Sequence, residues 1–119
     1  MTTRHSRNLL ITEDLIRAYS RRGNYHSEAS TSGALGLPGL VAQGLQVAGP
    51  AYGVLLDEWG EEFLAHGEIE LRFVGVVLAD TEVSAHVDIN DDIATLEVVI
   101  SDASTPAIVG SARRTAPTL

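Results

Sequence analysis

The histidines are the side chains of this sequence best suited to acid–base chemistry, because an imidazole titrates at about pH 6.5 and both takes and gives protons at neutral pH. Cysteine and lysine are absent, which excludes thiolate nucleophiles, disulfides, zinc–thiolate sites, Schiff-base chemistry and the phosphate-binding lysine of a P-loop. His26 follows Asn24 and Tyr25 in a short polar run behind Gly23. His26 is one candidate general acid–base, but taken alone its loop position is more typical of an exposed, inert histidine.

The other titratable groups favour structural interpretations. His5 lies near the chain terminus, His66 in a predicted loop and His86 on the outer face of a predicted strand. Four acids gather at the end of a predicted helix: Asp57, Glu58, Glu61 and Glu62. Such a cluster is typical of a solvated helix terminus. We expect neither a metal nor a cofactor.

The elements that must position His26 begin with a helical first third. A short strand from Asn8 to Ile11 precedes a helix that Thr12 caps. Arg21-Arg22-Gly23 is expected to end this helix, because basic residues and a following glycine are typical of helix C-termini. A second short helix is expected from Ser27 to Gly36. This arrangement places His26 in the connection between the two helices.

A long apolar segment and a series of alternating segments follow. Residues Leu40 to Trp59 are apolar on nearly every side, which predicts a buried helix with a kink at Pro50. Alternation with period two then predicts antiparallel strands. The expected strands are 69–73 with a continuous apolar run to 78, 83–89, 96–100 and 107–114, with turns at 90–92 and 102–106. One buried helix followed by four strands predicts an α+β hot-dog fold, an antiparallel sheet wrapped around a central apolar helix.

Length and charge limit the class of protein. The 119 residues are enough for one domain, assigned to residues 1–119, and the net charge of −8 argues against nucleic acid as a partner. No apolar run is long enough to cross a membrane, and Met1 to Arg7 lacks the apolar stretch of a signal peptide. We expect a soluble, cytoplasmic protein. Five of the eight arginines lie in the first 22 positions, which fits either an anionic ligand or an unevenly charged surface.

An ordered set of motifs resembles the MaoC-like (R)-specific hydratase/dehydratase family. That family carries Asp-x-Asn-Pro-x-His, then an Ala-Gly-(Leu/Phe)-Pro-Gly stretch and an Ala-His-Gly at the start of the central helix. This sequence has Asn24-Tyr25-His26, then Ala34-Leu35-Gly36-Leu37-Pro38-Gly39 and Ala42-Gln43-Gly44, with the family spacing between His26 and Gly44. Glu70-Leu71-Arg72-Phe73 resembles the family's Arg-Phe strand. The resemblance spans Asn8 to Arg114.

The resemblance implies a substrate and roles for particular residues. The substrate would be a β-hydroxyacyl or enoyl thioester carried by coenzyme A or an acyl carrier protein, with His26 as acid–base and the Gly44 amide holding the developing negative charge. Asn24, Tyr25 and Gln43 would contact the substrate. Gly44 is also interpretable as a close-packing glycine, and Asn24 as a turn residue.

Two departures from the family leave the function open. Arg21 stands where the family has its catalytic aspartate, and the motif's proline is missing. Arg21 and Arg22 could instead bind the phosphate of a pantetheine arm. Three hypotheses follow: an active hydratase or dehydratase, a non-catalytic subunit of a heterodimeric dehydratase, or a hot-dog thioesterase that uses a helix carboxylate. In each case the open edge of the sheet predicts a homodimer or a heterodimer with a related subunit.

Overall fold

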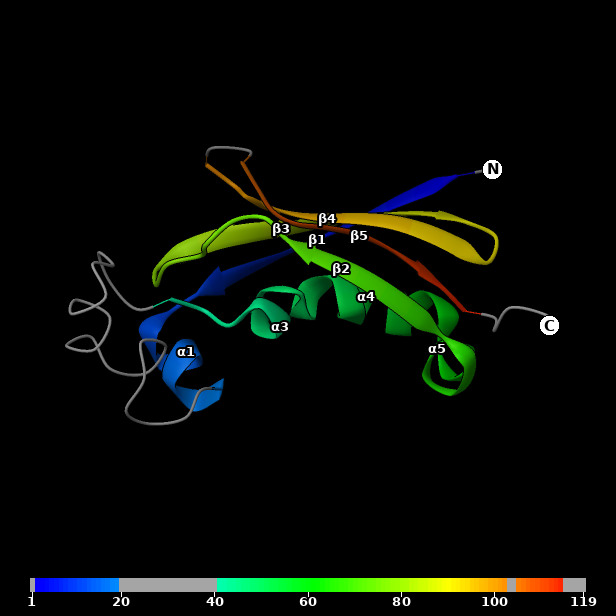
Figure 1. The fold of residues 1–119 in the computed structure, drawn as a ribbon, viewed down its shortest axis with the longest axis horizontal. Helices are drawn as coiled ribbons and strands as arrows, with labels where there is room; N and C mark the ends of the chain where they lie inside the picture. Colours follow the sequence, from blue (N-terminus) through cyan, green and yellow to red (C-terminus); the bar gives the residue numbers. More distant parts are fainter. Residues whose placement is uncertain (1, 20–40, 103–104, 115–119) are drawn as a thin grey trace.

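The computed structural model describes residues 2–19, 41–102 and 105–114. In chain order its elements are β1 (Thr3–Ile11), α1 (Glu13–Tyr19), α3 (Gly44–Val47), α4 (Gly49–Trp59), α5 (Glu61–His66), β2 (Glu68–Phe73), β3 (Thr81–Asn90), β4 (Ile93–Ile100) and β5 (Thr105–Arg113). The strands form one antiparallel sheet in the order β1-β3-β4-β5-β2, so β1 and β2 are its two edges. Figure 1 shows the sheet arching over the helices, which lie on one face of it.

The core lies between α4 and the inner face of the sheet, where α4 packs against β1, β3 and β4. The buried side chains that meet there include Ala51, Val54, Leu55 and Trp59 from α4 and Val83, Ala85, Val87, Leu96 and Val98 from the sheet. Burial of one such large aliphatic side chain contributes about 1.5–3 kcal/mol. The prediction of an antiparallel sheet wrapped around a central apolar helix, the hot-dog architecture, is confirmed.

The period-two pattern of the second half is visible in β3. Val83, Ala85 and Val87 are fully buried, whereas His86 and Asp88 point to the outer face. The hairpin to β4 turns through Asp91, whose φ of 56° lies in the left-handed region that aspartate tolerates. The strand and turn predicted here are therefore confirmed.

The predicted helix from Leu40 to Trp59 is in fact two helices, α3 and α4, separated at Ala48. Pro50 lies in the first turn of α4, where its missing N–H has no helical partner to lose. The Ala48 carbonyl still accepts a hydrogen bond from the Tyr52 amide at 3.1 Å. The proline therefore starts a new helix instead of kinking a continuous one.

Strand β1 reaches back to Thr3, beyond the predicted strand Asn8 to Ile11. Its inward-facing residues are partly charged, and α4 supplies their partners. His5 Nδ1 lies 3.4 Å from Glu58, and Arg7 pairs with Asp57. The first part of the strand does not show an apolar pattern because His5 and Arg7, rather than apolar side chains, contact α4 there.

Two further expectations are corrected. His66 is the last residue of α5, not a loop residue. The predicted continuation of β2 to residue 78 leaves the sheet instead, because the Val74 and Gly75 amides both donate to the Ala107 carbonyl, at 2.9 and 3.1 Å. Val77 then turns inward and is 2% exposed.

The first helix begins as predicted. The Thr12 hydroxyl accepts a hydrogen bond from the Leu15 amide at 3.2 Å, which caps α1. The described part of α1 ends at Tyr19. The expected helix end at Arg21-Arg22-Gly23 and the expected helix from Ser27 to Gly36 lie outside the described residues.

Candidate functional site

A pocket of about 390 Å³ opens between the start of α3, the end of β2 and the segment that follows β2. Backbone and uncharged side chains line it: Val41, Ala42, Gln43, Gly44, Leu45, Val47, Phe73, Gly75, Val76, Val77 and Ile108. No charged side chain contributes to this wall within residues 41–102 and 105–114. The pocket therefore fits an apolar group better than an ionic one.

Backbone contacts hold the start of α3 at the pocket. The Ala42 amide donates to the Val77 carbonyl at 2.8 Å, and Val41 forms an isolated antiparallel bridge with Leu78. Gln43 then remains extended, with φ −70° and ψ 145°, before the chain turns into α3 at Gly44. Because the first amides of a helix have no partner within that helix, Gly44 can offer its N–H to a ligand.

The side of Gly44 that lacks a side chain is covered by the ring of Phe73. A methyl group there would lie 2.5 Å from Phe73 Cε1 and 2.6 Å from Cδ1, well inside ordinary van der Waals contact. The Phe73 ring is itself 53% exposed. Glycine at this position thus allows an exposed aromatic ring at the end of β2 to close one wall of the pocket.

The structure brings together two of the residues that the sequence nominated, Gln43 and Gly44, which are neighbours in the pocket wall. The other nominated residues, Arg21, Arg22, Asn24, Tyr25 and His26, lie outside the described residues. The roles of all seven therefore remain predictions.

Sequence reasoning missed the wall opposite α3, which Phe73 and residues 75–77 provide. The available signal was the glycine inside an otherwise apolar run. A methyl group at Gly75 would lie 2.9 Å from the Pro106 carbonyl oxygen, so glycine lets this segment pass close to β5. That close passage carries Val76 and Val77 to the pocket.

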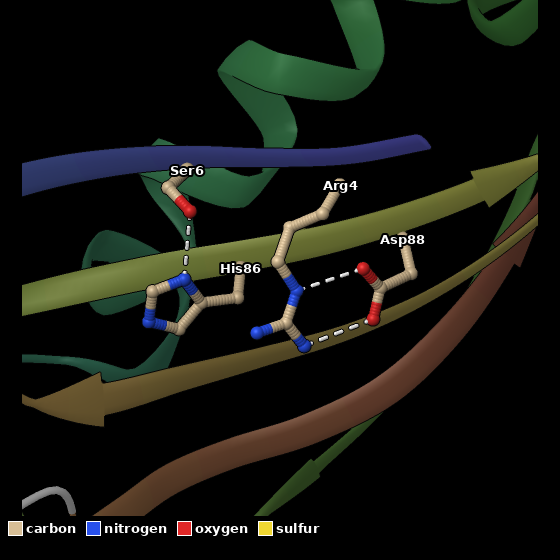
Figure 2. Close-up of polar contacts among 4 residues, drawn as sticks. All are labelled: Arg4, Ser6, His86 and Asp88. Atoms are coloured by element: carbon tan, nitrogen blue, oxygen red, sulfur yellow. Dashed lines mark hydrogen bonds and ion pairs between the residues drawn. The ribbon is translucent and has the colours of Figure 1, made fainter. Parts of the chain in front are cut away.

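A second group of polar side chains occupies the outer face of the sheet, across β1 and β3 (Figure 2). The Ser6 hydroxyl lies 2.8 Å from His86 Nδ1, and Arg4 donates two hydrogen bonds to Asp88, at 2.8 and 3.0 Å. The hydrogen bond from Arg4 holds the pKa of the Asp88 carboxyl below its usual value.

The geometry of this group fits cross-strand pairing better than catalysis. A serine–histidine pair becomes nucleophilic when a third group orients the imidazole, and here Asp88 is engaged by Arg4 and not by His86. Residues 6 and 86 face each other directly in the β1–β3 register, as do 4 and 88. Both pairs therefore fasten the edge strand β1 to its neighbour.

The acidic cluster, Asp57, Glu58, Glu61 and Glu62, lies at the C-terminal end of α4 and on α5. Asp57 contacts Arg7, Glu58 contacts His5, and Glu62 contacts Arg114. Arg114 Nε lies 2.7 Å from Asp92 and 3.6 Å from Glu62, with its guanidinium 5.9 Å from the Trp59 ring. The hydrogen bond to Asp92 raises the pKa of Arg114. None of the acids contributes to the described wall of the pocket, and the described residues contain no group of three or more candidate metal ligands.

No described helix is long and apolar enough to span a membrane. The sequence matches no protein-family model, and no curated protein resembles it closely enough to count as a match.

Solved structures match the fold over nearly the whole chain. An (R)-hydratase from A. caviae involved in PHA biosynthesis has a TM-score of 0.75 at 15% identity, over 97% of this chain and 95% of that one. A MaoC-like dehydratase from Phytophthora Capsici has a TM-score of 0.79 at 12% identity, over 96% of this chain and 42% of the other. The C terminal truncated HadBC (3R-hydroxyacyl-ACP dehydratase) complex from Mycobacterium tuberculosis matches at TM-score 0.70 and 19% identity, over 94% and 92%. The chain therefore has the hot-dog fold.

Proposed function

We propose that this chain binds an acyl thioester in the pocket beside α3 and catalyses the reversible addition of water to it. The observation that carries the proposal is an uncharged pocket with Gly44, the first residue of α3, in its wall. The hot-dog fold shared with an (R)-hydratase and a 3R-hydroxyacyl-ACP dehydratase supports it.

The pocket suits the acyl end of such a substrate. Its volume of about 390 Å³ lies within the range of about 300–1,000 Å³ typical of small-molecule sites. Apolar side chains such as Leu45, Phe73 and Val76 would contact the hydrocarbon chain, and Gln43 supplies an amide that can orient a polar group. The nucleotide or carrier end of the thioester would remain outside this pocket.

The proposed chemistry requires one base, one acid and one donor for negative charge. For dehydration, His26 takes the proton from the carbon next to the thioester, and the electron pair forms the double bond as the hydroxyl leaves. The protonated imidazole then gives that proton to the leaving hydroxyl, which departs as water, so one histidine serves both steps.

The Gly44 amide would donate a hydrogen bond to the thioester oxygen, where negative charge develops. Helix α3 is only four residues long, from Gly44 to Val47, so the field of a helix dipole adds little. The stabilisation proposed here is a local hydrogen bond in an apolar, low-dielectric setting.

A non-catalytic subunit is the second candidate, and the sequence gives a specific reason for it. Arg21 stands where MaoC-like enzymes carry their catalytic aspartate. Some structural neighbours are themselves complexes, such as HadBC. In this alternative, the chain would contribute a pocket wall to a partner that holds the acid–base pair.

The structure gives no support to the thioesterase hypothesis, which needs a carboxylate on the central helix beside the ligand. The acids of α4 are Asp57 and Glu58, near its C-terminal end, and they pair with Arg7 and His5 of β1. The described wall of the pocket lies instead around α3 and contains no carboxylate.

One assay separates the three functions. The purified chain is incubated with enoyl and β-hydroxyacyl thioesters of coenzyme A and of an acyl carrier protein, and the enoyl absorbance and free thiol are followed together. We expect loss of enoyl absorbance without thiol release, reversible from the hydroxyacyl side. Thiol release would indicate a thioesterase. Absence of turnover by the purified chain, restored when a related hot-dog subunit is added, would indicate a structural subunit.

A further inference from the structure

Helix α3 forms one wall of the pocket, although it is only one turn long. Three of its four residues, Gly44, Leu45 and Val47, line the pocket. In the described part of the chain, the Gln43 side chain does not cap this helix. A single helical turn is unfavourable by itself, because fixing its backbone costs more free energy than its few hydrogen bonds contribute. Contacts with other elements must therefore hold α3 in place.

Gln46 is the residue of α3 that does not line the pocket, and its side chain contacts α1 instead. Its Nε2 donates a hydrogen bond to the Leu15 carbonyl oxygen at 2.8 Å. Helix α1 is itself fixed to the core, because Ile11 just before it and Ile16 within it are fully buried, and Thr12 caps it. The side chain of Gln46 therefore connects the pocket helix to the core.

The other end of the same amide group gives a second observation. The Oε1 atom of Gln46 is hidden from solvent and has no hydrogen-bond partner among the described residues. An unpaired buried acceptor generally costs as much free energy as one neutral hydrogen bond contributes. Gln46 thus adds little net stability, and the bond from its Nε2 is the feature that an apolar side chain of the same length could not provide.

We propose that Gln46 is a positioning residue that holds α3, and with it Gly44, in the pocket wall. Gly44 lies two residues before Gln46 in the same helical turn, so any shift of α3 moves both. The inference rests on the proposed function, in which the Gly44 amide donates to the thioester oxygen. Without the bond to Leu15 that donor loses its alignment, and the charge that develops in the transition state is stabilised less well.

The test replaces Gln46 with methionine. Methionine is about as long as glutamine and is a good helix former, but its side chain has no N–H donor. Gln46→Met therefore removes the bond to Leu15 without opening a large cavity. Its melting temperature should equal or exceed the wild-type value, because the unpaired acceptor is removed as well. Leu15→Ala is the matched control, since it truncates a side chain that is 40% exposed and keeps the backbone carbonyl that accepts the bond.

Amide hydrogen exchange, followed by NMR, is the first readout. The Val47 and Ala48 amides donate the hydrogen bonds of this turn, at 3.1 and 2.9 Å, so their exchange rates report the opening of α3. In Gln46→Met both rates should rise at least about tenfold, while the amides of β3 exchange at wild-type rates. The control should leave both rates within about threefold of wild type.

Turnover of an enoyl thioester of coenzyme A is the second readout. Gln46→Met should lose at least about tenfold in kcat while KM changes less than about threefold, because the aligned donor acts in the transition state. The control should keep the wild-type kcat.

Three results would overturn the proposal. They are a melting temperature that falls together with kcat in Gln46→Met, unchanged exchange of the Val47 and Ala48 amides, or wild-type kcat in that variant. A wild-type chain that turns over no thioester would contradict the proposed function instead, and the exchange rates alone would then decide whether Gln46 holds α3.

Discussion

A methyl group added at Gly44 tests the pocket at its most constrained point. In Gly44→Ala the new carbon would lie 2.5 Å from Phe73 Cε1, whereas ordinary contacts begin near 3.4 Å, so the ring must retreat by about 1 Å. The ring is 53% exposed and can move outward. Replacing glycine also restricts the unfolded chain, which stabilises a compatible position by about 0.4–1 kcal/mol and offsets part of the lost contact.

We therefore expect the fold to tolerate the change while the site does not. The free energy of unfolding should change by less than about 1 kcal/mol. The displaced ring and the new methyl group both obstruct the approach to the Gly44 amide, so kcat/KM should fall at least about tenfold, equivalent to about 1.4 kcal/mol.

Two further variants make the result interpretable. Phe73→Ala removes the ring, so adding Gly44→Ala to it should cost less than Gly44→Ala alone, with a coupling energy of about 0.5–3 kcal/mol. Gly49→Ala is the matched control, because a methyl group there meets nothing within 4 Å. Additive effects of Gly44→Ala and Phe73→Ala on both stability and kcat/KM, or equal loss of turnover in Gly49→Ala, would refute this reasoning.

Three shorter predictions concern other parts of the chain. Changing both Arg21 and Arg22 to glutamine should weaken binding of a coenzyme A thioester, most strongly at low salt, and equal affinity at all salt concentrations would contradict a phosphate contact. The pKa of Asp88 is lowered by its hydrogen bond from Arg4, so the stability it contributes is present above its unfolded pKa of about 3.9 and is lost as the pH falls through the lower, folded value. The melting temperature should therefore fall below about pH 4, and less steeply in Asp88→Asn; equal slopes would contradict this. Leu55→Ala, at a fully buried position of α4, should cost about 2–5 kcal/mol in urea unfolding, and a loss below about 1 kcal/mol would show that the core lies elsewhere.

The sequence predicted the parts of the fold that apolar periodicity controls. Val83, Ala85 and Val87 alternate with polar residues, and the structure buries all three against α4. The long apolar segment from Leu40 to Trp59 likewise identified the central helix. In both places, the burial of apolar side chains determines the pattern, which can be read from residue types alone.

The sequence predicted less well where other interactions replace apolar burial. His5 and Arg7 extend β1 because Glu58 and Asp57 meet them from α4, a contact between distant segments that no local pattern contains. Pro50 begins a helix instead of bending one, and the choice depends on Ala48 keeping helical geometry before it.

The candidate site divides in the same way. Gly44 and Gln43 were nominated by motif spacing, and both line the pocket. Phe73 was noted only as part of a strand motif, because its position over Gly44 depends on β2 passing alongside α3 in three dimensions. Spacing along the chain can identify residues that lie on one segment. A pocket wall that combines two segments can be identified only from the three-dimensional structure.

The most direct test of the central proposal is the turnover of an enoyl thioester by wild-type, His26→Ala and His86→Ala protein, each confirmed as folded by circular dichroism. If His26 is the acid–base group, His26→Ala should lose about 10²–10⁴-fold in kcat, while His86→Ala, which alters only the outer face of the sheet, should retain wild-type turnover. Equal, measurable turnover in wild-type and folded His26→Ala protein would contradict the account, because the reaction would then not depend on His26.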